Sequence, residues 1–221
     1  MLQKLLSEYL GTLLLVFSVV GSGIMAENLS PTNEGVVLLA NAIATGAMLY
    51  VIISIFSPIS GAHFNPIVSL YFRLKSKITS IEMSLFIILQ IIGGISGVII
   101  ANYIFNDLFI EFSDKQRTGL NIHISEIIAS VGLLLTIVLS LRAKRDPAIA
   151  VALYITGAYW FTSSTSFANP AVTISRSLTN TFTGIDPAHI LGFIVSQIIG
   201  LIIAFLTVSY THLTLPTKVT V

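Results

Sequence analysis

Two short polar motifs interrupt the most apolar stretches of this chain. The first reads SGAHFNPIVS at residues 60–69, and the second reads SFANPAVTIS at residues 166–175. In each motif an asparagine, Asn65 or Asn169, directly precedes a proline. An asparagine amide carries two N–H donors, and proline suits the first position of a helix because its missing N–H has no partner there. The motifs therefore predict two short helices, each preceded by donors for the oxygen of a neutral molecule.

The remaining polar residues show no spacing that is typical of an enzyme or of a metal site. The chain has no cysteine, and no three of its His, Asp and Glu residues have metal-ligand spacing. No Ser-His-Asp set, His-Glu-x-x-His motif or glycine-rich phosphate loop is present. The net charge of +1 gives no reason to expect a nucleic-acid partner. The sequence therefore predicts neither an enzyme nor a cofactor.

The elements that position the two motifs are expected to be membrane-spanning helices. Of the residues, 54% are hydrophobic and only 10% are charged, whereas a soluble domain has about 25% charged residues. A span needs about 20 mostly apolar residues, and six segments qualify, at roughly 5–25, 36–56, 82–105, 122–141, 147–164 and 188–207. Two shorter segments, roughly 66–75 and 170–180, start at the prolines of the motifs. Each is about 15 Å of helix, or half a bilayer.

The chain consists of two copies of one unit. A Ser-Glu pair at residues 7–8 recurs at residues 125–126, and each copy contains one Asn-Pro pair. We expect one domain over residues 1–207, with one repeat at about 4–105 and the other at about 122–207. Each copy has three spans, which is an odd number, so the second copy enters the membrane from the opposite face. The pattern predicts an inverted internal repeat.

In such a repeat the two half-helices meet at the membrane midplane and bring Asn65 face to face with Asn169. Both helix N-termini then point at the centre, each with about half a positive charge. This arrangement donates hydrogen bonds to a neutral solute and repels cations. The sequence therefore predicts a pore for small uncharged solutes.

The distribution of basic residues predicts the orientation. With the N-terminus inside, seven basic residues are cytoplasmic: Lys4, Arg73, Lys75, Lys77, Arg142, Lys144 and Arg145. Only Lys115, Arg117 and Arg176 then fall outside. Because cytoplasmic loops carry an excess of Lys and Arg, we expect a multi-pass protein of the cell membrane with a cytoplasmic N-terminus.

The two Asn-Pro motifs between six spans resemble those of the major intrinsic proteins, the aquaporin family. The string SEYLGT at residues 7–12 is also typical of that family, and the likeness covers about residues 4–207. The resemblance implies an all-α integral membrane fold of six transmembrane helices and two half-helices, in lipid and usually as a homotetramer with one pore per subunit. The implied partners are water and small neutral solutes. The implied midplane residues are Asn65, Pro66, Ile67, Asn169, Pro170 and Ala171.

The chain departs from the family pattern in the first motif and at one filter position, whereas the second motif, Asn-Pro-Ala at residues 169–171, is regular. Ile67 replaces the usual alanine, so the junction of the first half-helix is expected to pack differently. The narrowest point of the family's pores is usually built from four positions, which fall here on Thr45, Gly157, Ser166 and Val172. Val172 stands where arginine is usual, so a bulky cation and its donors are lost. A wide, uncharged filter is expected, which argues against strict water selectivity.

Arg176 follows Val172 by four residues, so both lie on one face of the expected helix. Arg176 either stands at the outer pore mouth as a partial substitute or holds the outer loop through backbone carbonyls. The filter and the string STSFANPAVT also resemble a bacterial branch that is often found with arsenic-resistance functions. That likeness suggests arsenite, uncharged As(OH)₃, or glycerol-like polyols as solutes.

Three buried polar residues have two interpretations each. Glu8 and Glu126 could relay protons in a coupled transporter, or they could accept bonds from irregular backbone before each motif; their symmetry favours the structural interpretation. His63 could be a fixed pore-wall residue or a pH-sensitive gate. A strictly water-selective channel is the main alternative function, and an intramembrane enzyme or a junction protein are more distant rivals.

The end of the chain does not continue the pattern. The string VSYTHLTLPT at residues 208–217 resembles the conceptual translation of a transposon-type sequencing adapter. We therefore expect residues 208–221 to be a non-native tail, and a genuine short polar tail is the alternative.

Overall fold

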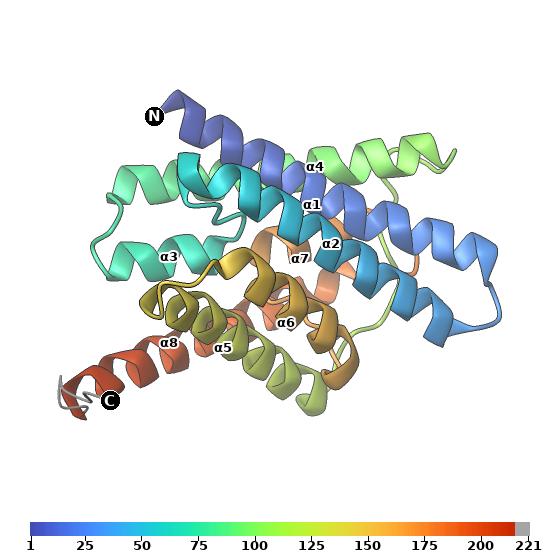
Figure 1. The fold of residues 1–221 in the computed structure, drawn as a ribbon. Coiled ribbons are helices and arrows are strands. Elements are labelled where there is room, and N and C mark those ends of the chain that lie inside the picture. Colours follow the sequence, from blue (N-terminus) through green and yellow to red (C-terminus); the bar gives the residue numbers. More distant parts are fainter. Residues whose placement is uncertain (215–221) are drawn as a thin grey trace.

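The computed structural model of the chain describes residues 1–214 and is a bundle of helices (Figure 1). The described part contains no strand. The six long helices are α1 (Leu2–Leu29), α2 (Glu34–Ser60), α4 (Ser80–Ile104), α5 (Leu120–Arg142), α6 (Pro147–Phe161) and α8 (Ile190–Thr214). Two short helices follow the Asn-Pro pairs, α3 (Pro66–Leu74) and α7 (Pro170–Arg176), and a single 3-10 turn, η1 (Pro187–His189), precedes α8. The predicted all-α architecture of six spans and two half-helices is confirmed.

The long helices match the expected spans, with one short member. Five of them are long and apolar enough to cross a membrane by length and composition, namely α1, α2, α4, α5 and the segment 187–210 that contains η1 and most of α8. Helix α6 has only 15 residues. It ends at Phe161 instead of near residue 164, and extended chain then leads to α7.

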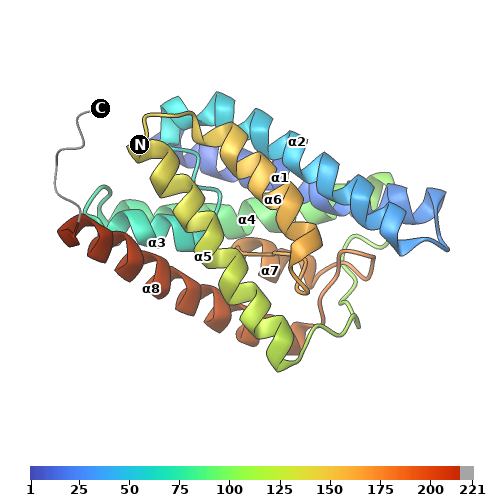
Figure 2. The same ribbon diagram turned by 60° about the horizontal axis from the view of Figure 1, so that its bottom comes forward.

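The two repeats are packed around the two short helices. In the first repeat α1 contacts α2 and α4, and in the second α5 contacts α6 and α8, while α2 and α6 join the repeats. Each short helix also crosses into the other repeat, because α3 contacts α8 and α7 contacts α4. Figure 2 shows α3 and α7 in the middle of the bundle, between α2 and α8. The fold therefore places both Asn-Pro pairs at its centre.

Close contacts between helix backbones make this packing possible. A Cβ atom on Gly93 would collide with the Tyr9 carbonyl, and one on Gly97 would collide with the Leu13 carbonyl, both in α1. In the second repeat a Cβ on Gly200 would lie 2.9 Å from the carbonyl oxygen of Ile127 in α5. Glycine lets membrane helices approach to backbone contact. These helix pairs are therefore fixed firmly enough to position the central loops.

The ends of two helices differ from the expected ones. Helix α7 stops at Arg176 instead of residue 180, because the amides of Ser177 and Leu178 bond to carbonyls three residues back and turn the chain. Helix α8 continues past residue 207 to Thr214. Val208 is buried within it, and Ser209 Oγ accepts a 2.8 Å bond from Lys75. Residues 215–221 lie outside the described residues, and the non-native tail stays a prediction.

Candidate functional site

The two asparagines bind each other's loops across the centre of the bundle. Asn65 Nδ2 donates to the carbonyl of Ala168 at 2.7 Å, and Asn169 Nδ2 donates to the carbonyl of Phe64 at 2.8 Å. Each side-chain oxygen caps its own short helix: Asn65 Oδ1 accepts from the amide of Ile67, and Asn169 Oδ1 accepts from the amides two and three residues ahead. An amide nitrogen has two hydrogens. One hydrogen on each side chain is thus fixed by the fold, and the second has no protein partner in the described structure.

The backbone before each asparagine is strained. Residues with φ between 46° and 59° precede both motifs: Ala62, Phe64, Thr165, Ser166 and Ala168. Residues other than glycine rarely adopt this left-handed conformation. It persists only where the surrounding structure holds it, and it clusters at functional sites.

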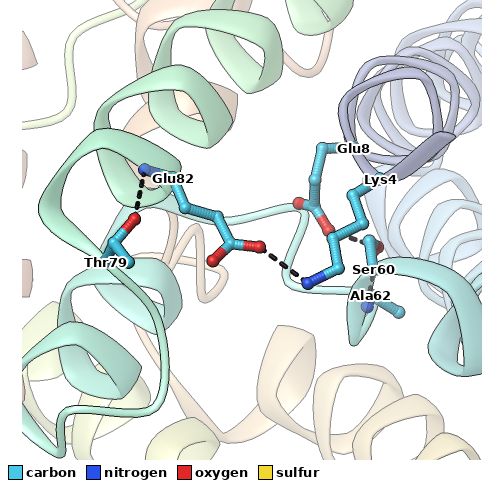
Figure 3. A network of polar contacts seen from close by, with 6 residues as sticks. All are labelled: Lys4, Glu8, Ser60, Ala62, Thr79 and Glu82. Carbon is cyan, nitrogen blue, oxygen red and sulfur yellow. Dashed lines mark hydrogen bonds and ion pairs between the residues drawn. The ribbon is translucent and has the colours of Figure 1, made fainter. Parts of the chain in front are cut away.

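In the first repeat, Glu8 holds the strained loop. Its buried carboxylate accepts from Ser60 Oγ at 2.6 Å, from the amides of His63 and Phe64 at 3.0 and 2.7 Å, and from Gln90 Nε2 at 2.8 Å. Figure 3 shows Glu8 and Ser60 beside the pair of Lys4 and Glu82, whose charged atoms are 2.7 Å apart. The carboxylate thus supplies acceptors to amides that the irregular backbone cannot pair with itself.

In the second repeat, Glu126 takes the equivalent position. It accepts from the amide of Ala168 and from Gln197 Nε2, the latter at 2.8 Å. Gln197 also bonds to Thr173 Oγ1 at 2.9 Å, as Gln90 bonds to Ser69 Oγ at 3.0 Å in the first repeat. These contacts are the ones that the structural interpretation of both carboxylates requires.

A cavity of about 240 Å³ runs through the bundle past both asparagines. Helices α2, α5 and α6 each line it with a stripe of residues four apart, and the stripe on α2 from Thr45 to Ser57 spans about 18 Å. The helices contribute many aliphatic residues to its wall, among them Leu15, Val19, Leu49, Ile53, Val68, Leu133, Ile137, Leu141, Val151 and Ile155. A long passage with apolar walls and two amide donors at its centre suits small molecules that keep few hydrogen bonds.

Only two of the six expected midplane residues line this cavity. Asn65 and Asn169 do, whereas Pro66, Ile67, Pro170 and Ala171 are buried within the protein. The side chain of Ile67 belongs to a core that includes Leu134, Val138, Leu201 and Val208. The isoleucine therefore fills space between α3 and the second repeat, away from the passage.

Three of the four expected filter residues line the cavity near one end: Thr45, Ser166 and Val172. Gly157 is not among the lining residues. Helix α6 presents Tyr159 instead, continuing the four-residue stripe from Val151 and Ile155, and the Tyr159 hydroxyl is 3.3 Å from Thr45 Oγ1. The assignment of Gly157 to the filter stays a prediction, and the irregular chain between α6 and α7 does not keep a helical period that would connect it to Asn169. The stripe itself is the sequence signal that points to Tyr159.

Arg176 combines the two roles that were considered for it. Its side chain is 2% exposed, and it lines the cavity at the same end as Val172. Its Nε donates to the carbonyl of Thr183, which holds the following loop. Its guanidinium carbon also lies 3.5 Å from the centre of the Phe167 ring. A cationic group is thus present beside the passage, one helical turn from Val172.

His63 lies towards the other end of the cavity. It is buried, its Nδ1 is 3.0 Å from Ser69 Oγ, and its ring stacks on Phe72 with centroids 4.9 Å apart. These contacts hold the imidazole against the wall. Among the residues that the structure describes, no group of three His, Cys, Asp or Glu side chains could hold a metal ion.

Comparisons with known proteins agree with this geometry. Residues 1–148 match the family described as major intrinsic protein. The chain is 46% identical to "Aquaglyceroporin AqpS" of Rhizobium meliloti (strain 1021) over 91% of its own length and 87% of that protein. It is 26% identical to human "Aquaporin-5" over 97% of its length and 82% of that protein. The X-ray structure of the aquaglyceroporin from Plasmodium falciparum shares the fold, with a TM-score of 0.73, 19% identity, and coverage of 93% and 94% of the two chains.

Proposed function

Because the chain belongs to the major intrinsic proteins, a family of membrane channels and not of enzymes, we propose that it is a passive channel for water and small uncharged solutes such as glycerol. One observation carries the proposal: a single cavity passes both asparagine amides, and each amide keeps one N–H after its bond to the opposite loop. A solute crossing the centre meets two donors from opposite sides. Its own gradient drives the flow.

Ions are excluded by the same features. The N-termini of α3 and α7 both begin at the central asparagines, and their partial positive charges repel cations. The walls on either side are apolar, so an ion of either sign would lose its hydration without replacement. The desolvation cost of a neutral polyol is far smaller, because each of its hydroxyls can replace its hydrogen bond to water by one to the amides and then to the loop carbonyls.

The proposed filter is formed by Thr45, Tyr159, Ser166 and Val172, with Arg176 one turn further along α7. Val172 takes the place of a longer cationic side chain, which leaves room for solutes larger than water. The name of the Rhizobium relative, an aquaglyceroporin, supports this choice. Within this proposal, uncharged As(OH)₃ is a further solute, because it presents three hydroxyls on a small body.

We also propose a homotetramer in the cell membrane with a cytoplasmic N-terminus. Lys75 and Arg142 bind adjacent residues of α8, since Lys75 donates to Ser209 Oγ at 2.8 Å and Arg142 donates to the carbonyl of Val208 at 3.4 Å. This places loops of both repeats on one basic face, as the orientation rule requires of the cytoplasmic side. The Arg176 end of the cavity then opens to the outside.

Stopped-flow light scattering on proteoliposomes tests the proposed function. Water, glycerol and arsenite gradients are applied in parallel, with empty liposomes as the baseline. We expect all three to move faster than in empty liposomes, and independently of a proton gradient. Flux of water alone would favour the strictly water-selective alternative. Glycerol flux that follows the proton gradient and is lost in Glu8→Gln would favour a coupled transporter.

A further inference from the structure

The three basic residues outside the proposed cytoplasmic face gather at the Arg176 end of the cavity. Arg117, in the loop before α5, has its guanidinium carbon 5.1 Å from the centre of the Phe167 ring, the ring that also carries Arg176. Lys115 Nζ lies 4.6 Å from the centre of the Phe182 ring, and Phe182 belongs to the loop whose carbonyls bind Arg117. Residues that are 59 positions apart in the sequence thus form one cationic cluster.

These cations are held by backbone carbonyls and not by acids. Arg117 donates to the carbonyls of Gly184 at 2.7 Å and Phe182 at 3.3 Å, and Arg176 donates to that of Thr183 between them. A carbonyl fixes a guanidinium but does not neutralise it. Within residues 1–210 the one ion pair is that of Lys4 with Glu82, at the other end of the molecule. Glu126 is the acid whose charge acts on both guanidinium groups, so two cations face one carboxylate and the cluster keeps a net positive charge.

Arg176 and Ser166, at this end of the cavity, have donor groups without a protein partner in the described part of the chain. The hydrogen bonds of the described residues use only Nε of Arg176, so its two terminal nitrogens, with four N–H groups, are available in the cavity wall. Ser166 is 3% exposed and lines the same end; its hydroxyl has no hydrogen-bond partner in the described structure and is closed off from the cavity in this rotamer, so a rotation about the Cα–Cβ bond is needed to turn it towards the passage. A buried hydroxyl without a partner is unfavourable unless a ligand supplies one.

We propose that Arg176 and Ser166, supported by the charge of Arg117, form a binding site for a small monovalent oxyanion at this mouth of the channel. The planar guanidinium suits two oxygen atoms of one group, and the Ser166 hydroxyl donates to the same group or to its third oxygen. The anion stays at the mouth, because the apolar wall beyond it, including Leu15 and Leu49, offers no replacement for its hydration. Bound there, it blocks the passage of neutral solutes.

Methanesulfonate is a suitable probe, since it is small, has three oxygens and is ionised at every working pH. It replaces chloride at constant ionic strength and osmolarity on both sides of the vesicles. We expect glycerol flux to fall in a saturable manner as methanesulfonate rises, and isothermal titration calorimetry of the detergent-solubilised full chain to give a matching affinity. The flux block rests on the proposed function. If glycerol does not move even without the anion, the proposed function fails while calorimetry still tests the site.

The variants assign the binding to the cluster. Ser166→Ala removes a hydroxyl that the fold does not use, so folding should be unaffected and the affinity for methanesulfonate should fall about tenfold, the loss of one bond to a charged group. Arg176→Gln should abolish measurable binding. Arg145→Gln, at the opposite face, is the matched control and should bind like the wild type. The proposal is overturned if the wild type binds no methanesulfonate, or if Ser166→Ala and Arg145→Gln bind it equally well.

Discussion

The two repeats hold their central loops in the same way but offer different side chains to a solute. Glu8 with Gln90 and Ser69 corresponds to Glu126 with Gln197 and Thr173, contact for contact. Two positions before the asparagines, however, the first repeat has His63 and the second has Phe167. The histidine ring stacks on Phe72, whereas the phenylalanine ring lies under Arg176. The shared residues fix the backbone, and the residues that differ give the two mouths their chemistry.

A second difference between the repeats concerns side-chain volume. The residue three positions after the anchoring glutamate is Gly11 in the first repeat and Ala129 in the second. The residue before the asparagine is Phe64 in the first and Ala168 in the second. A Cβ on Gly11 would collide with the Phe64 ring. The first repeat therefore pairs a large residue with a very small one, and the second repeat carries alanine at both positions.

The largest effect, a loss of stability, is expected at the anchoring glutamates, where the two repeats are alike. Glu8→Ala would leave four donors without their acceptor. Each buried, unsatisfied donor destabilises by about 1–3 kcal/mol, so the loss should be on the order of 4 kcal/mol or more. Glu126→Ala removes the acceptor of two bonds, from Ala168 and Gln197, so it should also destabilise but by less, as measured by thermal unfolding in detergent against the exposed control Glu111→Ala. If one repeat tolerated the change and the other did not, the two anchors would not be equivalent.

The next largest effect, on glycerol flux, is expected at the filter, where the two repeats differ. Val172→Arg places a long cation in the cavity wall next to Thr45 and Ser166, which narrows the passage and adds charge beside Arg176. We expect glycerol flux to fall by about tenfold or more, because excluding one carbon-sized group is worth on the order of 1–3 kcal/mol, while water flux persists. Val172→Ile is the control for bulk without charge. Unchanged glycerol flux in Val172→Arg would remove Val172 from the filter.

A double-mutant cycle tests the exchange of volume between Gly11 and Phe64. Gly11→Ala alone should lower the free energy of unfolding by about 1–3 kcal/mol, because overpacking forces the Phe64 ring to move. In the Phe64→Ala background the same change should have almost no effect, since the combination reproduces the alanine pair of the second repeat. Thermal unfolding of the four proteins gives the coupling energy. A coupling of zero would mean that the two positions do not share space.

The anchors and the half-helices could be predicted from the sequence because their signals are local and repeated. Asparagine suits the N-cap of a helix and proline its first position, and the Ser-Glu pairs mark the same position in both copies. The ends of α6 and α7 were predicted less accurately from the sequence. Apolar residues continue past Phe161 and Arg176, while the helices end where the chain must turn towards the centre. The amino-acid composition of these segments does not indicate where the chain turns.

The cationic cluster could be predicted only in part. Lys115, Arg117 and Arg176 were assigned to one face from the sequence, but no periodicity brings a loop residue beside a half-helix. Arg117 and Arg176 come together because the carbonyls of residues 182–184 accept hydrogen bonds from both guanidinium groups. Ser166 was expected in the filter from its distance to Asn169. Its lack of a hydrogen-bond partner became visible only in the packed structure.

The smallest effect distinguishes the two candidates on α6. Gly157→Ala should leave glycerol flux unchanged within about twofold, as for a site without special packing, because the added Cβ would make only an ordinary 3.5 Å contact with the Phe161 ring. Tyr159→Phe removes the hydroxyl beside Thr45 and should lower the ratio of glycerol to water flux by about two- to tenfold, the equivalent of one net hydrogen bond. Both fluxes are measured on the same vesicles. The reverse outcome would be that Gly157→Ala reduces glycerol flux and Tyr159→Phe has no effect. It would return Gly157 to the filter, and the wall of the second repeat would then lie two residues nearer the N-terminus of α6.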